Sequence, residues 1–350
     1  MRALVLSGGE GSRLRPITHT SAKQLIPIAN TPILFHALAQ IREAGIAEVG
    51  IVVGATADEV RAAVGDGSAW ELSVTYIPQE APLGIAHAVS AAADFVRGEP
   101  FLLYLGDNVL LEGVRRFVER FERERPDAQI LLARVREPEH FGVAVLEGDR
   151  VTRLVEKPTT FVSDVALVGV YLFDDQILEA CATLEPSGRG EYEITEAIQW
   201  LIDHGRTVRA EMVSGWWKDT GRPEDLLEAN RMMLSVLEPV VQGEVDADSR
   251  LDGAVRVDPG AKIVRSTLRG PVVIGAGALI EDSTVGPDAS ISFGCSVLGS
   301  TVEDSIVMER CVIERVTGMT GSILGRDVEL RGGRGARRLV LGDQSRAEID

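Results

Sequence analysis

Lysine, histidine and cysteine are all scarce in this chain of 350 residues. Four lysines occur among its 36 basic residues, and none of its five histidines lies beyond His204. The C-terminal third therefore offers no histidine for general acid or base catalysis. The three cysteines are an odd number without metal-ligand spacing, which indicates a reduced, cytoplasmic setting rather than a disulfide framework.

Net positive charge and long apolar runs are also missing. A formal net charge of −17 argues against nucleic acid as a partner, because polyanions require a basic surface. No apolar run reaches the length of a membrane span, and the first strand is expected to begin at residue 2, so we expect neither a signal peptide nor a membrane partner. Hydrophobic residues make up 45% of the chain, which can fill the cores of two domains.

The segment from Leu4 to Pro16 predicts a buried strand that ends in a glycine-rich turn with two arginines. Glycines let backbone N–H groups approach an anion, and a guanidinium adds charge-assisted hydrogen bonds. The segment lacks both the Gly-Lys-Ser/Thr end of a P-loop and the third glycine of a dinucleotide fingerprint. An ordinary glycine turn is the alternative. The rare lysine Lys23, ten residues after Arg13, favours a phosphate site.

Helices and strands alternate through the first two thirds of the chain. This alternation predicts a mostly parallel, Rossmann-like α/β sheet with helices on both faces, whose ligands bind at the carboxyl ends of the strands. The glycine turn and Gly106-Asp107-Asn108 fall at such ends. Shorter strands between residues 127 and 173 predict a mixed-sheet insertion over the site. The elements expected first are strands at 49–53, 74–77 and 101–105 and helices at 32–44, 58–64 and 84–96.

Aliphatic residues recur every five to six positions from about residue 251. This period, interrupted by glycine and proline, is typical of a parallel β-helix. We therefore expect two domains, comprising residues 1–238 and 239–350. The series consists of Val257, Ile263, Leu268, Ile274, Ile280, Val285, Ile291, Val297, Val302, Val307 and Ile313.

Two motifs resemble the signature of sugar-1-phosphate nucleotidylyltransferases, and among these the glucose-1-phosphate thymidylyltransferases. They are Gly-Gly-x-Gly-x-Arg-Leu-x-Pro at 8–16 and Lys-Gln-Leu-Ile-Pro-Ile at 23–28. The tail resembles the extension of the family's long form, which implies a nucleotidyltransferase fold followed by a left-handed β-helix. Related bifunctional enzymes use a histidine base in such a tail. The tail here has none, so we expect it to be structural or oligomeric. The resemblance continues through residues 79–84, 106–108, 141–143, 156–158, 187–191 and 217–221.

This resemblance implies transfer of a thymidylyl group from dTTP to α-D-glucose 1-phosphate, giving dTDP-glucose and pyrophosphate in a cytoplasmic homo-oligomer. The displacement is in line and Mg²⁺-dependent, and it requires no protein nucleophile. A UTP-dependent uridylyltransferase and a non-catalytic nucleotide-sugar-binding subunit are the alternatives. The Lys23-Gln24-Leu25 run favours dTTP. The sequence argues against a non-catalytic subunit, because it contains all of the residues Arg13, Lys23, Asp107, Lys157 and Asp219.

The candidate residues fall into three groups, with Arg13, Lys23 and Asp107 as the catalytic set. Arg13 is expected on the leaving pyrophosphate and Lys23 on the α-phosphate. An aspartate after a strand is otherwise a turn or cap residue, but the resemblance implies that Asp107 and Asp219 bind the metal. The nucleotide group comprises Leu6, Gly8, Gly9, Gly11, Ser12, Arg13, Lys23, Gln24, Gln79, Gly84 and Asp107, with Gln79 and Gly84 on the base. The sugar-phosphate group comprises Asn108, Gly142, Glu156, Lys157, Leu167, Arg189 and Trp217, with Glu156 on the sugar hydroxyls and Lys157 and Arg189 on the phosphate.

Overall fold

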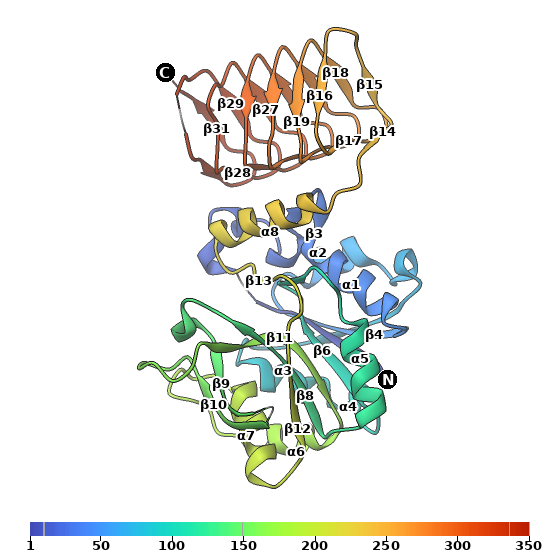
Figure 1. Ribbon diagram of the computed structural model, residues 1–350, viewed down its shortest axis with the longest axis vertical. Helices are drawn as coiled ribbons and strands as arrows, with labels where there is room; N and C mark the ends of the chain where they lie inside the picture. The colour runs from blue at the N-terminus through green and yellow to red at the C-terminus, as the bar shows by residue number, and fades with distance from the viewer. Residues whose placement is uncertain (10, 149, 336, 350) are drawn as a thin grey trace. The chain divides into compact units, whose positions relative to one another are not determined.

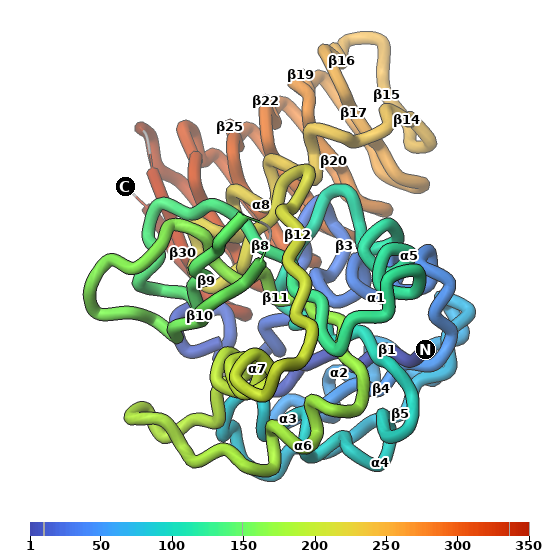
Figure 2. The backbone as a smooth tube through the Cα atoms, turned by 60° about the horizontal axis from the view of Figure 1, so that its bottom comes forward, coloured from blue at the N-terminus to red at the C-terminus, as the bar shows by residue number. Residues whose placement is uncertain are grey.

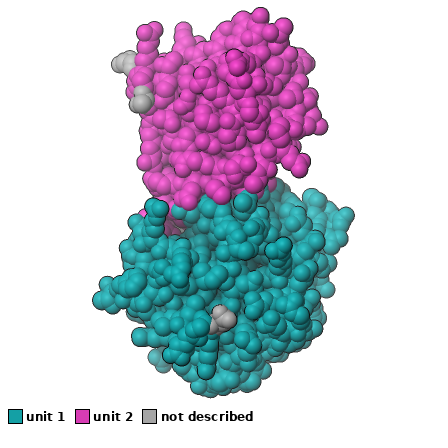
Figure 3. Space-filling model, in the orientation of Figure 1, with its two compact units in different colours: residues 1–10, 34–219 teal, residues 11–33, 220–350 magenta. Residues whose placement is uncertain are grey.

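The computed structural model describes residues 1–9, 11–148, 150–335 and 337–349, which form two compact units (Figure 3). The first unit is Met1–Glu10 with Leu34–Asp219, and the second is Gly11–Ile33 with Thr220–Asp350. Contacts thus group the segment after the glycine turn with the C-terminal part of the chain. The division into residues 1–238 and 239–350 stays a prediction.

A nine-stranded sheet is built by the described residues of the first unit (Figure 1). Its first four strands are parallel, and the remaining strands mix both directions. The mixed pairing after residue 127 is as predicted, and these strands extend the main sheet. In spatial order the strands are β5 (Ser73–Pro78), β4 (Glu48–Val53), β1 (Arg2–Ser7), β6 (Phe101–Leu105), β11 (Val165–Phe173), β8 (Ala128–Arg134), β12 (Val208–Met212), β10 (Arg150–Glu156) and β9 (Gly142–Glu147).

Helices cover both faces of this sheet. Strand β6 illustrates why both faces need a cover, because its successive side chains point to opposite faces of the sheet and are buried on both. Phe101 and Leu103 belong to the core beside helices α3, α6 and α7, whereas the Tyr104 hydroxyl bonds Gln40 on helix α1 at 3.1 Å. None of the described helices is long and apolar enough to cross a membrane. The helices of this unit are α1 (Ile33–Glu43), α2 (Ala57–Val64), α3 (Ile85–Ala91), α4 (Ala93–Val96), α5 (Arg115–Glu124), α6 (Gln176–Thr183) and α7 (Ile194–Asp203).

The C-terminal part of the second unit is a β-helix of stacked parallel coils, consistent with the predicted left-handed form (Figure 2). All the aliphatic residues of the predicted series are 1% exposed or less, so the predicted fold class is confirmed in both parts. The first sheet contains β14 (Val240–Val241), β17 (Val255–Val257), β20 (Val272–Ile274), β23 (Ala289–Ile291), β26 (Ile306–Val307), β28 (Ile323–Leu324) and β30 (Val340–Leu341). The second contains β15 (Glu244–Val245), β18 (Lys262–Val264), β21 (Leu279–Glu281), β24 (Ser296–Leu298), β27 (Val312–Glu314), β29 (Glu329–Arg331) and β31 (Arg346–Glu348). The third contains β16 (Arg250–Asp252), β19 (Thr267–Arg269), β22 (Thr284–Val285) and β25 (Thr301–Val302).

A ladder of serines runs along one corner of the β-helix. The Ser266 hydroxyl accepts the backbone N–H of Ser283 at 3.0 Å, and the Ser283 hydroxyl accepts that of Ser300 at 3.0 Å. A buried N–H without a partner is costly, so each serine supports the next coil. The aliphatic period did not predict this ladder, because its serines lie between the apolar positions.

The second unit also contains a helix and a short hairpin outside the coils. Helix α8 (Pro223–Ser235) begins with proline in its first turn, where the missing N–H costs nothing. A short hairpin pairs β2 (Pro27–Ile28) with β3 (Thr31–Pro32). Helix α8 packs against both β2 and β23, so it lies between the hairpin and the coils.

Candidate functional site

Two distant aspartates are brought to neighbouring strand ends in the first unit. Strand β6 ends at Leu105, Asp107 follows, and β7 (Asn108–Leu110) pairs antiparallel with β13 (Trp217–Asp219). The register sets Asp219 opposite Asn108, next to Asp107 along the chain. The motifs named both aspartates, but the pairing of β7 with β13 is visible only in the structure.

Asn108 fixes the side chains around this point and is 2% exposed. Its Oδ1 accepts the Trp217 indole N–H at 2.6 Å and the Gly169 backbone N–H at 3.2 Å. Its Nδ2 donates to Asp107 Oδ1 at 2.9 Å. Asn108 therefore orients both the carboxylate and the indole, in addition to its predicted place in the sugar-phosphate group.

Gly169→Ala is expected to lower the stability of the fold by about 1–3 kcal/mol, since buried side chains cannot yield without strain. A Cβ at Gly169 would lie 2.7–2.8 Å from side-chain atoms of the buried Asn108. Thermal or denaturant unfolding measures the change. Gly188→Ala is the matched control, because a Cβ there meets nothing within 4 Å. Equal stability of the two variants would contradict the close fit around Asn108.

Several residues of the predicted sugar-phosphate group gather around Glu156. Its carboxylate lies 3.7 Å from Lys157 Nζ and 3.6 Å from Arg189 Nη2. A Cβ at Gly142 would lie 2.9 Å from Glu156 Oε2 and 3.8 Å from Leu167 Cδ1. The site thus contains a carboxylate that can accept hydroxyl hydrogens beside two cations that can bind a phosphate.

The pKa of Glu156 is raised, chiefly by burial and further by the charge of Glu193. Lys157, the Thr195 hydrogen bond and Arg189 act in the opposite direction without cancelling the shift. The charged form of Glu156 is therefore disfavoured by burial more than its cationic neighbours favour it. Further hydrogen-bond donors would stabilise the carboxylate, and the hydroxyls of a ligand can supply them.

Glu193 and Thr195 are residues of this cluster that the motif analysis missed. Glu193 is 5% exposed, and its Oε1 accepts hydrogen bonds from Arg189 Nη2 at 2.8 Å and from the Ser187 hydroxyl at 2.8 Å. Thr195 donates to Glu156 Oε2 at 3.1 Å. Burial lowers the pKa of Arg189, but the hydrogen bonds and charge of Glu193, together with the charges of Glu191 and Glu156, outweigh burial and raise that pKa. The four-residue spacing from Arg189 to Glu193 was the available signal.

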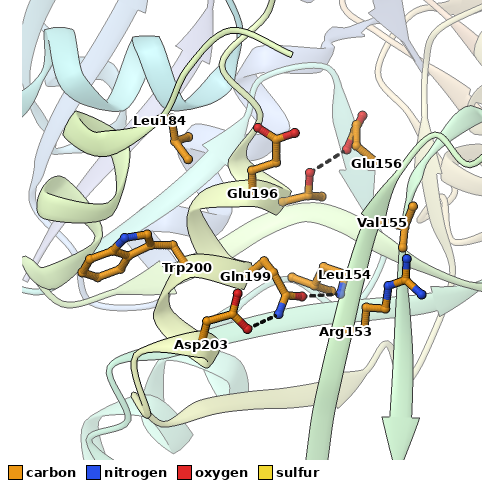
Figure 4. Close-up of a pocket in the computed structure, with 10 residues that line it drawn as sticks. Arg153, Leu154, Val155, Glu156, Leu184, Glu196, Gln199, Trp200 and Asp203 are labelled. Carbon is orange, nitrogen blue, oxygen red and sulfur yellow. Dashed lines mark hydrogen bonds between the residues drawn. The ribbon is translucent and has the colours of Figure 1, made fainter. Parts of the chain in front are cut away.

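A cavity of about 430 Å³ lies between β10 and α7 (Figure 4). Glu156 and Thr195 line it, as do Gln199 and Asp203. Gln199 bridges the two elements, accepting the Leu154 N–H at 2.8 Å and donating to Asp203 at 2.8 Å. These bonds hold α7, which carries Thr195, against the strand that carries Glu156.

The base-side candidates of the first unit also adjoin one another. Leu6 lies in β1, and Gly8 and Gly9 follow that strand. A Cβ at Gly8 would lie 3.0 Å from Gln79 Oε1, and Gln79 Nε2 donates to the Gly84 carbonyl at 3.3 Å. Gly84 has a φ of +105°, and a Cβ there would lie 2.5 Å from the Tyr192 carbonyl oxygen, so only glycine fits.

The remaining nucleotide candidates belong to the second unit. Gly11 has a φ of +62°, and a Cβ there would lie 3.1 Å from the Cβ of Lys23. Ser12 and Arg13 form a short turn after it, and a Cβ at Gly221 would lie 3.2 Å from Arg13 Nη2. Lys23 is 5% exposed and Gln24 2% exposed. The chain after the glycine turn therefore folds back on itself at Gly11 and Lys23.

The donors at Asp107 and Asp219 suit a hard divalent cation, which prefers carboxylate oxygens and completes its shell with phosphate oxygens and water. Both side chains are half-buried. Groups of three or more His, Cys, Asp or Glu that could hold a metal are absent among the described residues. A cation held by Asp107 and Asp219 would complete its shell with phosphate oxygens or water.

Known proteins resemble this chain along its whole length. A model of the nucleotidyl transferase family matches residues 2–236. A glucose-1-phosphate thymidylyltransferase of Streptomyces griseus is 53% identical, with 100% of this chain and 99% of that protein covered. One of Streptomyces antibioticus is 49% identical with the same coverage. A crystal structure of a candidate glucose-1-phosphate thymidylyltransferase from Bacillus anthracis, in complex with sucrose, is 35% identical with a TM-score of 0.63, covering 66% of this chain and 94% of that one.

Proposed function

We propose that this chain, which belongs to the nucleotidyl transferase family, is an enzyme. The enzyme transfers a thymidylyl group from dTTP to α-D-glucose 1-phosphate. The products are dTDP-glucose and pyrophosphate. The observation that carries the proposal is the identity of 53% and 49% to two glucose-1-phosphate thymidylyltransferases over the whole chain.

The proposed reaction is a direct displacement at phosphorus. A phosphate oxygen of glucose 1-phosphate forms a bond to the α-phosphorus of dTTP, and the bond to the β-phosphate bridging oxygen breaks, so pyrophosphate leaves with the electron pair. Arg13 neutralises the leaving pyrophosphate and Lys23 the α-phosphate. The reaction needs no covalent intermediate with the protein. Most of the catalysis therefore comes from residues that hold the two polyanionic substrates in line and neutralise their charge.

Lys157 and Arg189 bind the sugar phosphate, while Glu156 accepts hydrogen bonds from sugar hydroxyls. The proximity of both cations to Glu156, at 3.7 and 3.6 Å, supports this arrangement. Gln79 and Gly84 contact the base, and an amide suits the paired donor and acceptor edge of thymine.

Enzymes of this family typically use a divalent metal ion. We propose that the ion is Mg²⁺ and that Asp107 and Asp219 hold it. When bound, the ion neutralises charge on the phosphate oxygens. We also propose a cytoplasmic homo-oligomer whose subunits meet through the β-helix.

The proposal is tested by comparing initial rates with dTTP and UTP at saturating glucose 1-phosphate. We expect dTTP to be favoured about tenfold or more in kcat/KM, since the two nucleotides differ by small groups that a shaped pocket distinguishes. Pyrophosphate release measures the rate. A preference for UTP would assign a uridylyltransferase, and nucleotide-sugar binding without transfer would assign a non-catalytic subunit.

A further inference from the structure

The segment that carries Arg13 and Lys23 is fastened to the β-helix at three places. We call this segment, residues 11–33, the phosphate loop. It belongs to the same compact unit as the coils, although more than 200 residues separate them in sequence. At each place the coils contact the loop through polar side chains or backbone atoms, and not through their buried aliphatic side chains.

The first fastening joins the loop to the last coils through Asp343. Its Oδ2 accepts the hydroxyl hydrogens of Thr20 at 2.8 Å and Ser21 at 3.2 Å. Arg326 Nη1 donates to the Ser21 hydroxyl at 2.9 Å, and the Arg326 backbone N–H donates to Asp343 Oδ1 at 2.8 Å. Hydrogen bonds to a carboxylate are stronger than neutral ones, so this group holds the loop two residues before Lys23.

The second fastening holds the turn between β2 and β3. Ala29 and Asn30 both have left-handed backbones, with φ of 47° and 63°, and alanine is disfavoured there. Asn30 Nδ2 donates to the Ile291 carbonyl at 2.8 Å, and its Oδ1 accepts the Ser292 hydroxyl at 3.0 Å. The coil therefore stabilises a turn that the sequence of the loop alone does not favour.

Asn230 of helix α8 reinforces the same turn and is fully buried. Its Oδ1 accepts the Ala29 N–H at 2.8 Å and the Ser290 hydroxyl at 2.6 Å. Its Nδ2 donates to the Asp288 carbonyl at 3.2 Å. One amide thus joins the loop and the coil, and none of its polar atoms is left without a partner.

The third fastening is a close backbone approach. A Cβ at Gly342 would lie 3.0 Å from the Pro16 carbonyl oxygen and 3.3 Å from the Pro16 Cβ. Pro16 follows Arg13 by three residues. The fastenings therefore lie on both sides of Lys23, which is 5% exposed, and just after the exposed Arg13.

We infer that the β-helix positions the phosphate loop for nucleotide binding, with Asp343 as a positioning residue that acts through Thr20 and Ser21. The inference rests on the proposed function and extends it, since the tail would then act in catalysis without touching substrate. Misplacing a substrate-holding group by an ångström can lower rates up to about a hundredfold, so a loop that loses its support binds the triphosphate less well.

The test compares Asp343→Ala with the loop-side variant Thr20→Val/Ser21→Ala in the full chain. Both are expected to weaken dTTP binding, measured by calorimetry, and to raise the KM for dTTP by about tenfold. The KM for glucose 1-phosphate should change by less than about twofold, because its candidate residues lie in the other unit. Combining the two variants should add little, since each alone removes the hydrogen bonds of Thr20 and Ser21 to Asp343. Asp343→Asn keeps one acceptor for the Thr20 and Ser21 hydroxyls but loses the acceptor for the Arg326 N–H, so it should restore part of the affinity.

Asp258→Ala is the matched control. Asp258 accepts a hydrogen bond from Arg256 Nε at 2.9 Å and lies in the same β-helix as Asp343, several coils earlier. Equal effects of the two alanine variants would overturn the inference, as would unchanged dTTP binding in Asp343→Ala. A wild-type chain without transfer activity would refute the proposed function. Weaker dTTP binding by Asp343→Ala in such a chain would still support positioning of the loop.

Discussion

Asp107→Asn is expected to lower turnover about a hundredfold or more while leaving the fold intact. The amide removes charge from one of the two proposed metal ligands, but its oxygen can still accept the hydrogen bond from Asn108 Nδ2, which is 2.9 Å long in the wild-type chain. Steady-state kinetics over a range of Mg²⁺ concentrations measures the effect. A weakened metal site also predicts that the Mg²⁺ concentration for half-maximal rate increases.

Asp58→Asn is the control for this variant. It makes the same chemical change on α2, where the Asp58 side chain is fully exposed. Asp58 Oδ1 lies 3.9 Å from Arg61 Nη1. Its kinetics should match those of the wild-type chain. Near-normal turnover of Asp107→Asn at limiting Mg²⁺ would remove Asp107 from the metal site.

Arg13→Ala is expected to lower kcat by about a hundredfold to a thousandfold. In the proposed displacement, negative charge develops on the pyrophosphate as the bond to the α-phosphorus breaks, and the guanidinium stabilises that charge. The side chain is exposed and lies against Gly221, so its removal leaves no cavity in the core. Single-turnover measurements with dTTP distinguish the chemical step from product release.

Arg15→Ala provides a matched control two residues away. Arg15 is exposed on the same turn, and the proposal gives it no contact with the nucleotide. Its kcat should stay within about twofold of the wild-type value, since exposed substitutions away from a site have small effects. If both variants lost activity equally, general positive charge on the turn would explain the loss, and the assignment of Arg13 to pyrophosphate would be wrong.

Short-range patterns were sufficient to predict the two architectures. Strand β6 spans Phe101–Leu105 as predicted, because a continuous apolar run between turn residues has few other solutions in an α/β fold. The aliphatic series from Val257 to Ile313 is buried throughout, because each coil repeats the same inward positions. Such periods depend on local geometry and can be read without knowing which elements meet.

The surroundings of the site residues were less accessible to prediction. Asp107 and Glu156 were named through their motifs, and their proposed roles stay predictions. The support that Asn108 gives to Asp107, and that Thr195 gives to Glu156, depends on side-chain geometry that motifs do not encode. A single asparagine or threonine is common in turns and helix caps, so composition alone does not distinguish a supporting residue from an ordinary one.

Sequence periodicity and motifs alone thus established an α/β sheet followed by aliphatic coils, because burial imposes a repeat on neighbouring residues. Only the tertiary structure decided that the phosphate loop belongs with those coils. Thr20 and Asp343 lie 323 positions apart and meet through one hydrogen bond. A contact of this kind has no period and no compositional trace, since it depends on how the stacked coils and the loop lie against each other.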